Sequence, residues 1–445
     1  MNVYAGIDLG STTTKAVIMT EDGHLLGRGI TNSRNNYDVA CAVARAEALT
    51  TARFELLRRA ITAARALSDP AGALLRLLER RFRREQHERQ LESLRETCLL
   101  MITSPDDQAP VEEIFAGMRD ESITLFAPEG TARAASDFFR DIAASQYHRL
   151  AEDIARRGQG RFDRLMGCFD KSIFRAENSP PDLSFESNIR AALSKSVAEK
   201  AISGDGTVEE LSSMVQTAAR TPFLECGATG TGYGRVRLPF PKESIRSEIL
   251  CHGLGAHYFF PATATVLDIG GQDTKAIQVD EQGIVTSFQM NDRCAAGCGR
   301  YLGYIADEMN LAVQELGPLA LQSCRPTRIA STCTVFAGAE LRERLSLGQK
   351  REDILAGLHR AIILRSMSLL ARSGGVREQF TFTGGVARNP AALAAVRSLI
   401  EENYGQRTIN ISPDSIYTGA VGAALFAKRG SREETAERDH ARTAH

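Results

Sequence analysis

The sequence predicts an α/β protein whose duplicated core is interrupted by a large, mostly helical insertion. Two glycine-rich segments, 6–18 and 266–279, predict the duplication, because each has the order strand, Asp, glycine turn, Thr-Lys, strand. Between them, residues 39–219 are rich in Ala, Leu, Arg and Glu, and their apolar residues recur every three or four positions, which predicts helices. With 445 residues the chain is also longer than one hydrophobic core normally allows.

The helical run divides the predicted core into segments that are far apart in the chain. The expected first lobe consists of 1–38, 220–264 and 412–430, the second lobe of 265–411, and the insertion of 39–219. At the N-terminus, the apolar runs 3–9 and 15–19 flank a polar turn, which predicts a β-hairpin. The polar segment 431–445 is expected to be disordered.

Charge and composition argue against two classes of partner. The 54 basic and 55 acidic side chains nearly cancel, so the chain as a whole has no field that would attract nucleic acid or an anionic membrane. No uncharged apolar run reaches the roughly 18 residues of a membrane span, and the chain opens on a strand-like segment instead of a signal peptide. We therefore expect a cytoplasmic protein without a nucleic-acid or membrane partner.

The two matching turns predict a phosphate-binding site. Glycine lets the backbone approach phosphate oxygens and present N–H groups to them, and an aspartate at a strand end is a suitable oxygen ligand for Mg²⁺. Two glycine-containing hairpins without a ligand are the alternative, but the duplication favours a clamp around one triphosphate. The candidate catalytic residues are Asp8, Asp268 and Gln272. The candidate phosphate-binding residues are Gly10, Ser11, Thr12, Thr13, Lys15, Gly270, Gly271, Asp273 and Lys275.

A third glycine turn lies in FTFTGGVARNP, residues 380–390. Gly384 and Gly385 would let a purine or ribose pack on the backbone, and Asn389 would hydrogen bond to it, although a plain strand-to-helix turn fits these residues equally well. The order of two phosphate turns and one adenosine turn resembles the actin, Hsp70 and sugar-kinase ATPase superfamily. This resemblance implies a duplicated, ribonuclease-H-like ATPase core that binds ATP and Mg²⁺.

Cysteines are concentrated in the second predicted lobe. Cys294 in NDRCAAGCGRYL and Cys333 in ASTCTVFAGAEL should lie near helix starts, where the helix dipole and free N–H groups favour a thiolate. The residues alone leave four possibilities: buried structural thiols, a catalytic thiol, a zinc site that includes Cys298 and Cys324, or an iron–sulfur cluster. A cluster usually needs four thiolates, so two per chain suggest a cluster that two chains share.

Six motifs in the same order resemble the BadF/BadG/BcrA/BcrD ATPase family: GIDLGSTTTKAVI, ATGTGYGR, LDIGGQDTKAI, FQMNDRCAAGCGRYL, STCTVFAGAEL and TGGVARNP. This family contains 2-hydroxyacyl-CoA dehydratase activators and the ATPase subunits of benzoyl-CoA reductase. The resemblance implies that Cys294 and Cys333 ligate a [4Fe–4S] cluster between two subunits, and that the protein passes low-potential electrons from ferredoxin to a partner. Cys298 stands where the family commonly has Thr, so its role stays open.

The insertion makes this chain longer than the compact activators, so within the family it resembles most the larger ATPase subunit of a benzoyl-CoA reductase. That implies a smaller homologous ATPase subunit sharing the cluster, and acyl-CoA-reducing subunits as further partners. A dehydratase activator is the alternative within the family. A small-molecule kinase with structural cysteines and a chaperone-like ATP-driven binding module are alternatives from other classes.

Three further residues and the insertion lie outside these motifs. Glu248 lies between the two phosphate turns in the sequence and is a candidate base for activating water, with an exposed helix glutamate as the alternative. His252 and His257, the histidines nearest to the cysteines, are expected to be ordinary polar residues. The insertion is expected to bind partner subunits, on the basis of its size and amphipathic pattern.

Overall fold

The computed structural model describes eight stretches of the chain: 1–33, 36–64, 72–127, 138–178, 184–234, 238–291, 299–329 and 334–443. They belong to two compact units. The first unit combines Met1–Leu49 with Phe223–His445, and the second is Thr50–Pro222, where the sequence places the insertion at 39–219.

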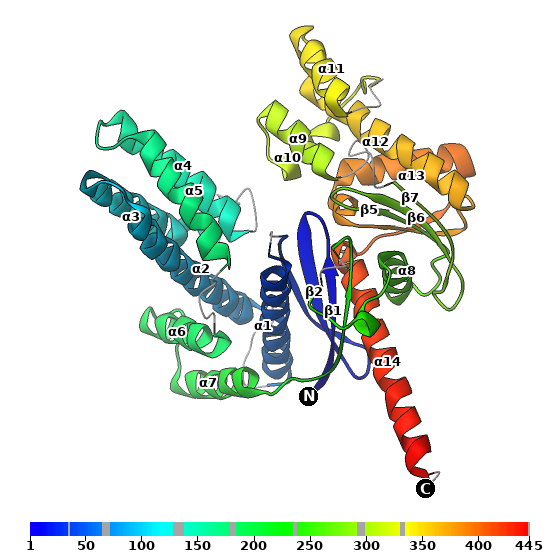
Figure 1. Cartoon of the computed structure of the whole chain (residues 1–445), viewed down its shortest axis with the longest axis horizontal. Helices are drawn as coiled ribbons and strands as arrows, with labels where there is room; N and C mark the ends of the chain where they lie inside the picture. The colour runs from blue at the N-terminus through cyan, green and yellow to red at the C-terminus, as the bar shows by residue number, and fades with distance from the viewer. Residues whose placement is uncertain are drawn as a thin grey trace. The chain divides into compact units, whose positions relative to one another are not determined.

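The first sheet has the strand order β3-β2-β1-β4. Figure 1 labels its two central strands, β1 and β2. Its strands are β1 Asn2–Leu9, β2 Thr13–Thr20, β3 Leu25–Asn32 and β4 Leu224–Thr231. β1 and β2 pair antiparallel, which confirms the predicted hairpin, and β4 joins β1 in parallel from far along the chain. The register places Asp8 opposite Lys15 on β2 and Thr231 on β4, so the predicted catalytic aspartate lies at the end of a buried central strand.

The second sheet repeats this arrangement and has the order β7-β6-β5-β8-β9. Its strands are β5 Thr265–Ile269, β6 Thr274–Val279, β7 Val285–Asn291, β8 Gln379–Thr383 and β9 Thr408–Asn410. β5 pairs antiparallel with β6 and parallel with β8. Asp268 lies opposite Lys275 and Thr383, as Asp8 lies opposite Lys15 and Thr231, so the duplication read from the sequence extends to strand pairing.

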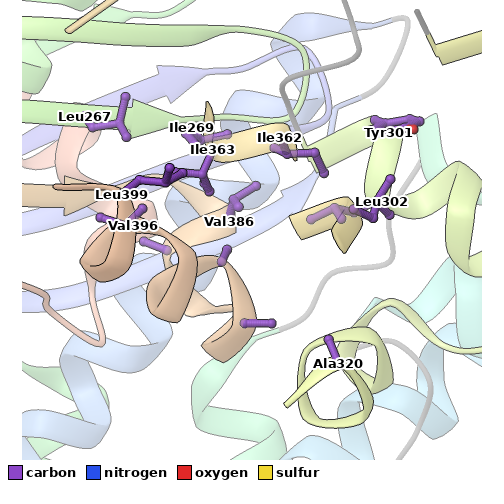
Figure 2. Close-up of a cluster of buried hydrophobic side chains, with 14 of the residues drawn as sticks. Leu267, Ile269, Tyr301, Leu302, Ala320, Ile362, Ile363, Val386, Val396 and Leu399 are labelled. Carbon is purple, nitrogen blue, oxygen red and sulfur yellow. The ribbon is translucent and has the colours of Figure 1, made fainter. Parts of the chain in front are cut away.

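Helices follow and cover these strands in the first unit. The described helices are α8 Glu248–Phe259, α9 Gly299–Met309, α10 Val313–Ala320, α11 Thr334–Ser346, α12 Arg351–Ser373, α13 Pro390–Tyr404 and α14 Thr418–Thr443, with short 3₁₀ helices η3 Lys242–Ser244, η5 Gly385–Arg388 and η6 Ser415–Tyr417. Figure 2 shows the core in which α9, α12 and α13 pack against β5, with Leu267, Tyr301, Ile363 and Leu399 among its buried side chains. Because α9 shares this core with β5, the helix is anchored to the strand that carries Asp268.

One described helix, α12, is long and apolar enough to cross a membrane. Its buried residues include Ile354, Leu358 and Ile362, and these belong to the hydrophobic core of the first unit. Figure 2 labels Ile362 and Ile363 of this helix in that core. α12 is thus a core helix of a globular unit.

Glycines let α14 pack very closely against β1 and α8. A Cβ on Gly6 would lie 2.0 Å from a backbone oxygen of α14. A Cβ on Gly255 would lie 2.0 Å from the carbonyl oxygen of Thr418, and one on Gly422 would lie 1.8 Å from that of Cys251. α8 and α14 therefore cross backbone to backbone, without side chains between them.

α14 also corrects an expectation. The structure continues this helix to Thr443, through most of the segment 431–445 that we expected to be disordered. The segment is rich in Ala, Arg and Glu, which have high helix propensity, so a helix that has already formed can extend along it.

The second unit contains only helices among its described elements. After α1 Tyr37–Ala63, which enters it from the first unit, these are α2 Ala73–Met101, η1 Pro105–Asp107, α3 Gln108–Leu125, α4 Phe139–Arg156, α5 Phe162–Asn178, α6 Phe185–Ala198 and α7 Asp205–Arg220. One apolar cluster joins α2, α3, α4 and α5. Another joins α1, α2, α6 and α7, where the rings of Phe54, Phe82 and Phe185 pack with centroids 5.1 to 5.2 Å apart.

Candidate functional site

The two predicted phosphate turns lie against each other. A Cβ on Gly271, in the turn between β5 and β6, would lie 2.3 Å from Oγ1 of Thr12, in the turn between β1 and β2. Gly10 is equally constrained, because its Cβ would lie 2.8 Å from the carbonyl oxygen of Thr13 and 3.0 Å from Nζ of Lys15. Glycine at these positions leaves backbone at the surface of each turn, as an anion-binding turn requires.

Each turn is flanked by a lysine from the strand that follows it. Nζ of Lys15 lies 3.8 Å from Oδ2 of Asp8. Nζ of Lys275 lies 2.6 Å from Oδ2 of Asp273 and 3.6 Å from Oδ1 of Asp268. Burial alone would lower the pKa of Lys275, but the neighbouring carboxylates raise it above the ordinary value, so this lysine is a fixed cation beside the second turn.

Asp268 is buried, and each of its carboxylate oxygens has a polar or charged neighbour. Thr383 Oγ1 donates a hydrogen bond of 2.8 Å to Oδ2 of Asp268, while Lys275 faces Oδ1. Burial alone would raise the pKa of Asp268, but His252, Lys275 and the hydrogen bond from Thr383 hold it well below its ordinary value. Asp268 is therefore ionised at neutral pH, which suits a ligand for a hard cation.

Glu248, the first residue of α8, belongs to this site. It is buried, so the alternative of an exposed helix glutamate is wrong. Its Oε1 lies 3.9 Å from Nζ of Lys275. Burial raises the pKa of Glu248, with Asp273 and Asp8 adding to the increase and Lys275 opposing it. A carboxyl group with a raised pKa is suited to proton exchange nearer neutral pH.

His252, which we expected to be an ordinary polar residue, also belongs to the site. It is buried on α8, and its Nδ1 lies 3.2 Å from Oδ2 of Asp268. Burial alone would lower the pKa of His252, but the charge of Asp268 raises it above the ordinary value. The sequence held one indication of this role: His252 follows Glu248 by four residues, which places both on the same face of a predicted helix.

The third glycine turn lies at the end of β5. Gly384 has φ +86°, and its Cβ would lie 2.3 Å from the carbonyl oxygen of Ile269, so only glycine fits without strain. Asn389 caps α13, since its Oδ1 accepts hydrogen bonds from the N–H groups of Ala391 and Ala392. Its Nδ2 lies 3.0 Å from Nε2 of His359. The contacts of Gly384, Gly385 and Asn389 with adenosine stay predictions.

The cysteines predicted as metal ligands, Cys294 and Cys333, lie outside the described residues, as does Cys298. Their described neighbours contact the second turn or the strand that follows it. Asn291 at the end of β7 pairs with Thr274, which begins β6. At the start of α9, the N–H of Gly299 donates to the carbonyl oxygen of Gly270, and that of Arg300 to Gly271, both at 2.8 Å.

Within the eight described stretches, no group of three or more His, Cys, Asp or Glu side chains is arranged to hold a metal ion. Each of the remaining predicted residues belongs to one of the two turns or to the strand beside it. Ser11 and Thr12 lie in the first turn, Thr13 begins β2, and Gln272 lies in the second turn beside Gly271 and Asp273. The structure therefore brings together the predicted residues of both phosphate turns and adds Glu248 and His252 to them.

Comparison with known proteins agrees with this arrangement. The model of the BadF/BadG/BcrA/BcrD ATPase family matches residues 5–427. The (R)-2-hydroxyglutaryl-CoA dehydratase activating ATPase of Acidaminococcus fermentans is 40% identical over 235 residues, which are 53% of this chain and 88% of that protein. The 2-hydroxyisocaproyl-CoA dehydratase activator of Clostridioides difficile is 41% identical over 208 residues, 46% of this chain and 75% of that protein. One of the benzoyl-CoA reductase subunits of Thauera aromatica is 36% identical over 176 residues, 39% of this chain and 62% of that protein.

Two solved structures share the fold. The crystal structure of A. fermentans (R)-2-hydroxyglutaryl-CoA dehydratase component A aligns with a TM-score of 0.51 and 22% identity, covering 97% of this chain and 100% of that one. The C. difficile 2-hydroxyisocaproyl-CoA dehydratase activator with bound ADPNP aligns with a TM-score of 0.52 and 22% identity, covering 98% and 97%. The α/β fold class of duplicated actin/Hsp70/sugar-kinase-like ATPases is confirmed, together with the resemblance read from the six motifs.

Proposed function

Because the chain belongs to the BadF/BadG/BcrA/BcrD ATPase family, we propose that it hydrolyses ATP to drive electrons to a partner that acts on an acyl-CoA. The observation that carries this proposal is the contact between Gly271 and Thr12, which joins two glycine turns, each with its own lysine. Two such turns offer backbone N–H groups and two cations to one polyphosphate, as expected for a nucleotide clamp.

Mg²⁺ fits the carboxylates of this site. Asp8 and Asp268 are buried at the ends of matching strands, and carboxylate oxygens are the ligands that Mg²⁺ prefers. When bound, the ion would neutralise charge on the phosphates. Lys15 and Lys275 would then orient the phosphates, and Glu248 would hold or release a proton beside them.

We assign Cys294 and Cys333 to a [4Fe–4S] cluster shared with a second subunit. The chemistry of the donors supports this assignment, because cysteine thiolates are the usual ligands of such clusters, which supply low-potential electrons when bound. The hydrogen bonds from Gly299 and Arg300 to the second turn also support it. Through these hydrogen bonds, a change of the turn on phosphate binding would act directly on α9, the helix that follows Cys294.

The relatives favour one partner class. Activators of 2-hydroxyacyl-CoA dehydratases match this chain at 40% and 41% identity, whereas the benzoyl-CoA reductase chain of T. aromatica matches at 36% over a smaller share of the chain. An activator of a 2-hydroxyacyl-CoA dehydratase is therefore our first candidate. The ATPase subunit of a benzoyl-CoA reductase is the second, because the activating ATPase of A. fermentans matches only 53% of this chain. That second candidate includes a smaller homologous ATPase subunit, acyl-CoA-reducing subunits and ferredoxin as partners.

Anaerobic purification tests the electron-transfer part of this proposal. We expect a brown protein with iron and acid-labile sulfide, whose spectrum and reduction potential change when ATP is added. Cys294→Ser and Cys333→Ser should each lower the iron content. Cys324→Ser is the matched control, because this exposed cysteine should leave iron unchanged.

Two outcomes would contradict the proposal. Zinc that is lost on Cys324→Ser would point to a mononuclear zinc site. A colourless, iron-free protein that transfers the γ-phosphate of ATP to a small alcohol would point to a kinase with structural cysteines.

A further inference from the structure

His252 occupies a position between the two matching halves of the core. On one side, its Nδ1 lies 3.2 Å from Oδ2 of Asp268, at the end of β5. On the other side, its Nε2 faces the start of α14, where a Cβ on Gly419 would lie 2.8 Å from this nitrogen and 3.0 Å from Oδ2 of Asp8. One buried imidazole therefore lies beside the carboxylates of both duplicated strands.

The duplication is asymmetric at this point. In the second half, Thr383 from the parallel neighbour strand donates to Asp268. In the first half, the equivalent Thr231 donates instead to the carbonyl oxygen of Arg246, at 3.0 Å. Oδ2 of Asp268 thus accepts a hydrogen bond from Thr383 and lies in an ion pair with His252, while Oδ1 lies 3.6 Å from Nζ of Lys275.

A carboxylate held at one oxygen can present the other in a defined direction. We propose that His252 is a positioning residue, which together with Thr383 fixes Oδ2 of Asp268 so that Oδ1 faces the phosphate turn. The inference rests on the proposed ATP site and concerns how that site is built. Residues that orient a metal-binding carboxylate typically change metal affinity or activity by about 10-fold to 100-fold when they are removed.

The position of His252 in α8 also links the orientation of Asp268 to the contact between α8 and α14. His252 lies on α8, one residue after Cys251, whose carbonyl oxygen is in the closest contact between α8 and Gly422 of α14. The backbone that carries His252 is therefore held at that helix crossing, and a shift of the crossing would move the ring with it. The orientation of the Asp268 carboxylate therefore depends, through His252, on how α8 packs against α14.

The test measures ATP hydrolysis and binding of a fluorescent ADP analogue as functions of Mg²⁺ concentration, with the full chain. His252→Ala should raise the half-saturating Mg²⁺ concentration about 10-fold or more and lower kcat, with a smaller change in the KM for ATP at saturating Mg²⁺. His87→Ala is the matched control, because it removes an equally buried histidine in the helical unit. It should leave the Mg²⁺ dependence unchanged.

Two amide variants separate positioning from simple packing. The side-chain amide of Asn reproduces the place of Nδ1, whereas that of Gln reproduces the place of Nε2, so His252→Asn should restore Mg²⁺ affinity better than His252→Gln. If His252→Ala fails to fold, these two variants still show whether His252 positions Asp268 or only fills space. In the background of Asp268→Asn, His252→Ala should have little further effect, because both act through one carboxylate.

Wild-type Mg²⁺ dependence in His252→Ala, an equal effect of Asn and Gln, or full additivity with Asp268→Asn would each overturn the positioning role alone. A wild-type protein that neither binds nor hydrolyses ATP would instead overturn the proposed function on which the role depends.

Discussion

The N–H of Gly299 donates to the carbonyl oxygen of Gly270 at 2.8 Å, so α9 begins on the second glycine turn. Residues 292–298, which contain Cys294, precede α9 in the chain and follow β7, whose last residue Asn291 pairs with Thr274 directly after this turn. A ligand that orders the turn should also order the start of α9.

We expect amide hydrogen exchange to report this coupling. Binding of ADP or a non-hydrolysable ATP analogue should slow exchange in peptides covering 270–275 and 299–303 together, because the hydrogen bonds between them open together. Peptides of α13, which begins in the third turn, should respond to nucleotide independently of α9. Protection of 270–275 without any change at 299–303 would show that the turn and the helix are not coupled.

Gly271→Ala should weaken ATP binding. The new Cβ would lie 2.3 Å from Oγ1 and 3.0 Å from Cβ of Thr12, so either the Thr12 side chain or the two turns must shift. We expect the KM for ATP to rise about 10-fold, equivalent to roughly 1.4 kcal/mol. Steady-state ATPase assays measure it, and Thr12→Ala in the same chain should restore part of the loss.

Gly303→Ala is the control for this substitution. A Cβ on Gly303, in α9, meets no atom within 4 Å, and Ala in a helix is more favourable than Gly by about 0.5 to 1 kcal/mol. It should raise the melting temperature slightly and leave the KM unchanged. Equal KM values in the two variants would contradict the contact between the turns.

Glu248→Gln should lower kcat with little change in KM, if Glu248 exchanges protons during hydrolysis. Loss of a positioned acid or base typically costs about 10²-fold or more in kcat. The matched control is Glu243→Gln, which changes an exposed glutamate on η3 and should retain full activity. A Glu248→Gln variant with unchanged kcat at every pH would assign this residue to structure alone.

The same variant should alter how stability depends on pH. Burial raises the pKa of Glu248 above its ordinary 4.5, so the folded protein binds this proton more tightly than the unfolded chain. The contribution of Glu248 is therefore favourable at low pH and is lost as pH rises through the folded pKa. Relative to wild type, Glu248→Gln should gain thermal stability as pH increases above its ordinary pKa, which melting curves across pH can measure.

Phe82→Ala should destabilise the helical unit strongly. Phe82 is fully buried between Phe54 and Phe185, and removal of such a ring typically costs about 3 to 5 kcal/mol. Phe174→Ala is the control in the same unit, because that ring is 48% exposed and should cost about 1 kcal/mol or less. Denaturant unfolding followed by far-UV circular dichroism separates them, and similar losses would contradict the ring cluster.

The sequence predicted the parts of the site whose residues lie close together in the chain. Asp8 and Lys15 belong to one hairpin, as do Asp268 and Lys275, so local spacing predicts both the strand pairing and the lysine beside each turn. The repeated pattern then predicts the duplication, and helical periodicity predicts an all-helical second unit.

The site residues that the sequence did not identify depend on packing between segments that are far apart in the chain. Glu248 reaches Lys275, and His252 reaches Asp268, only because α8 packs against β5 and β6. Their spacing of four residues places both on one face of a predicted helix, but it does not show what that face contacts. The continuation of α14 through most of 431–445 was missed for a different reason: polarity suggested disorder, whereas helix propensity favoured the existing helix.

The contacts at Gly6, Gly255 and Gly422 constrain how this protein could be recombined with its relatives. Each glycine faces a backbone atom contributed by a segment far away in the chain, so an exchange that brings any larger residue to one of these places would force the segments apart. A functional hybrid must therefore keep glycine at all three positions in β1, α8 and α14, whichever parent supplies each element.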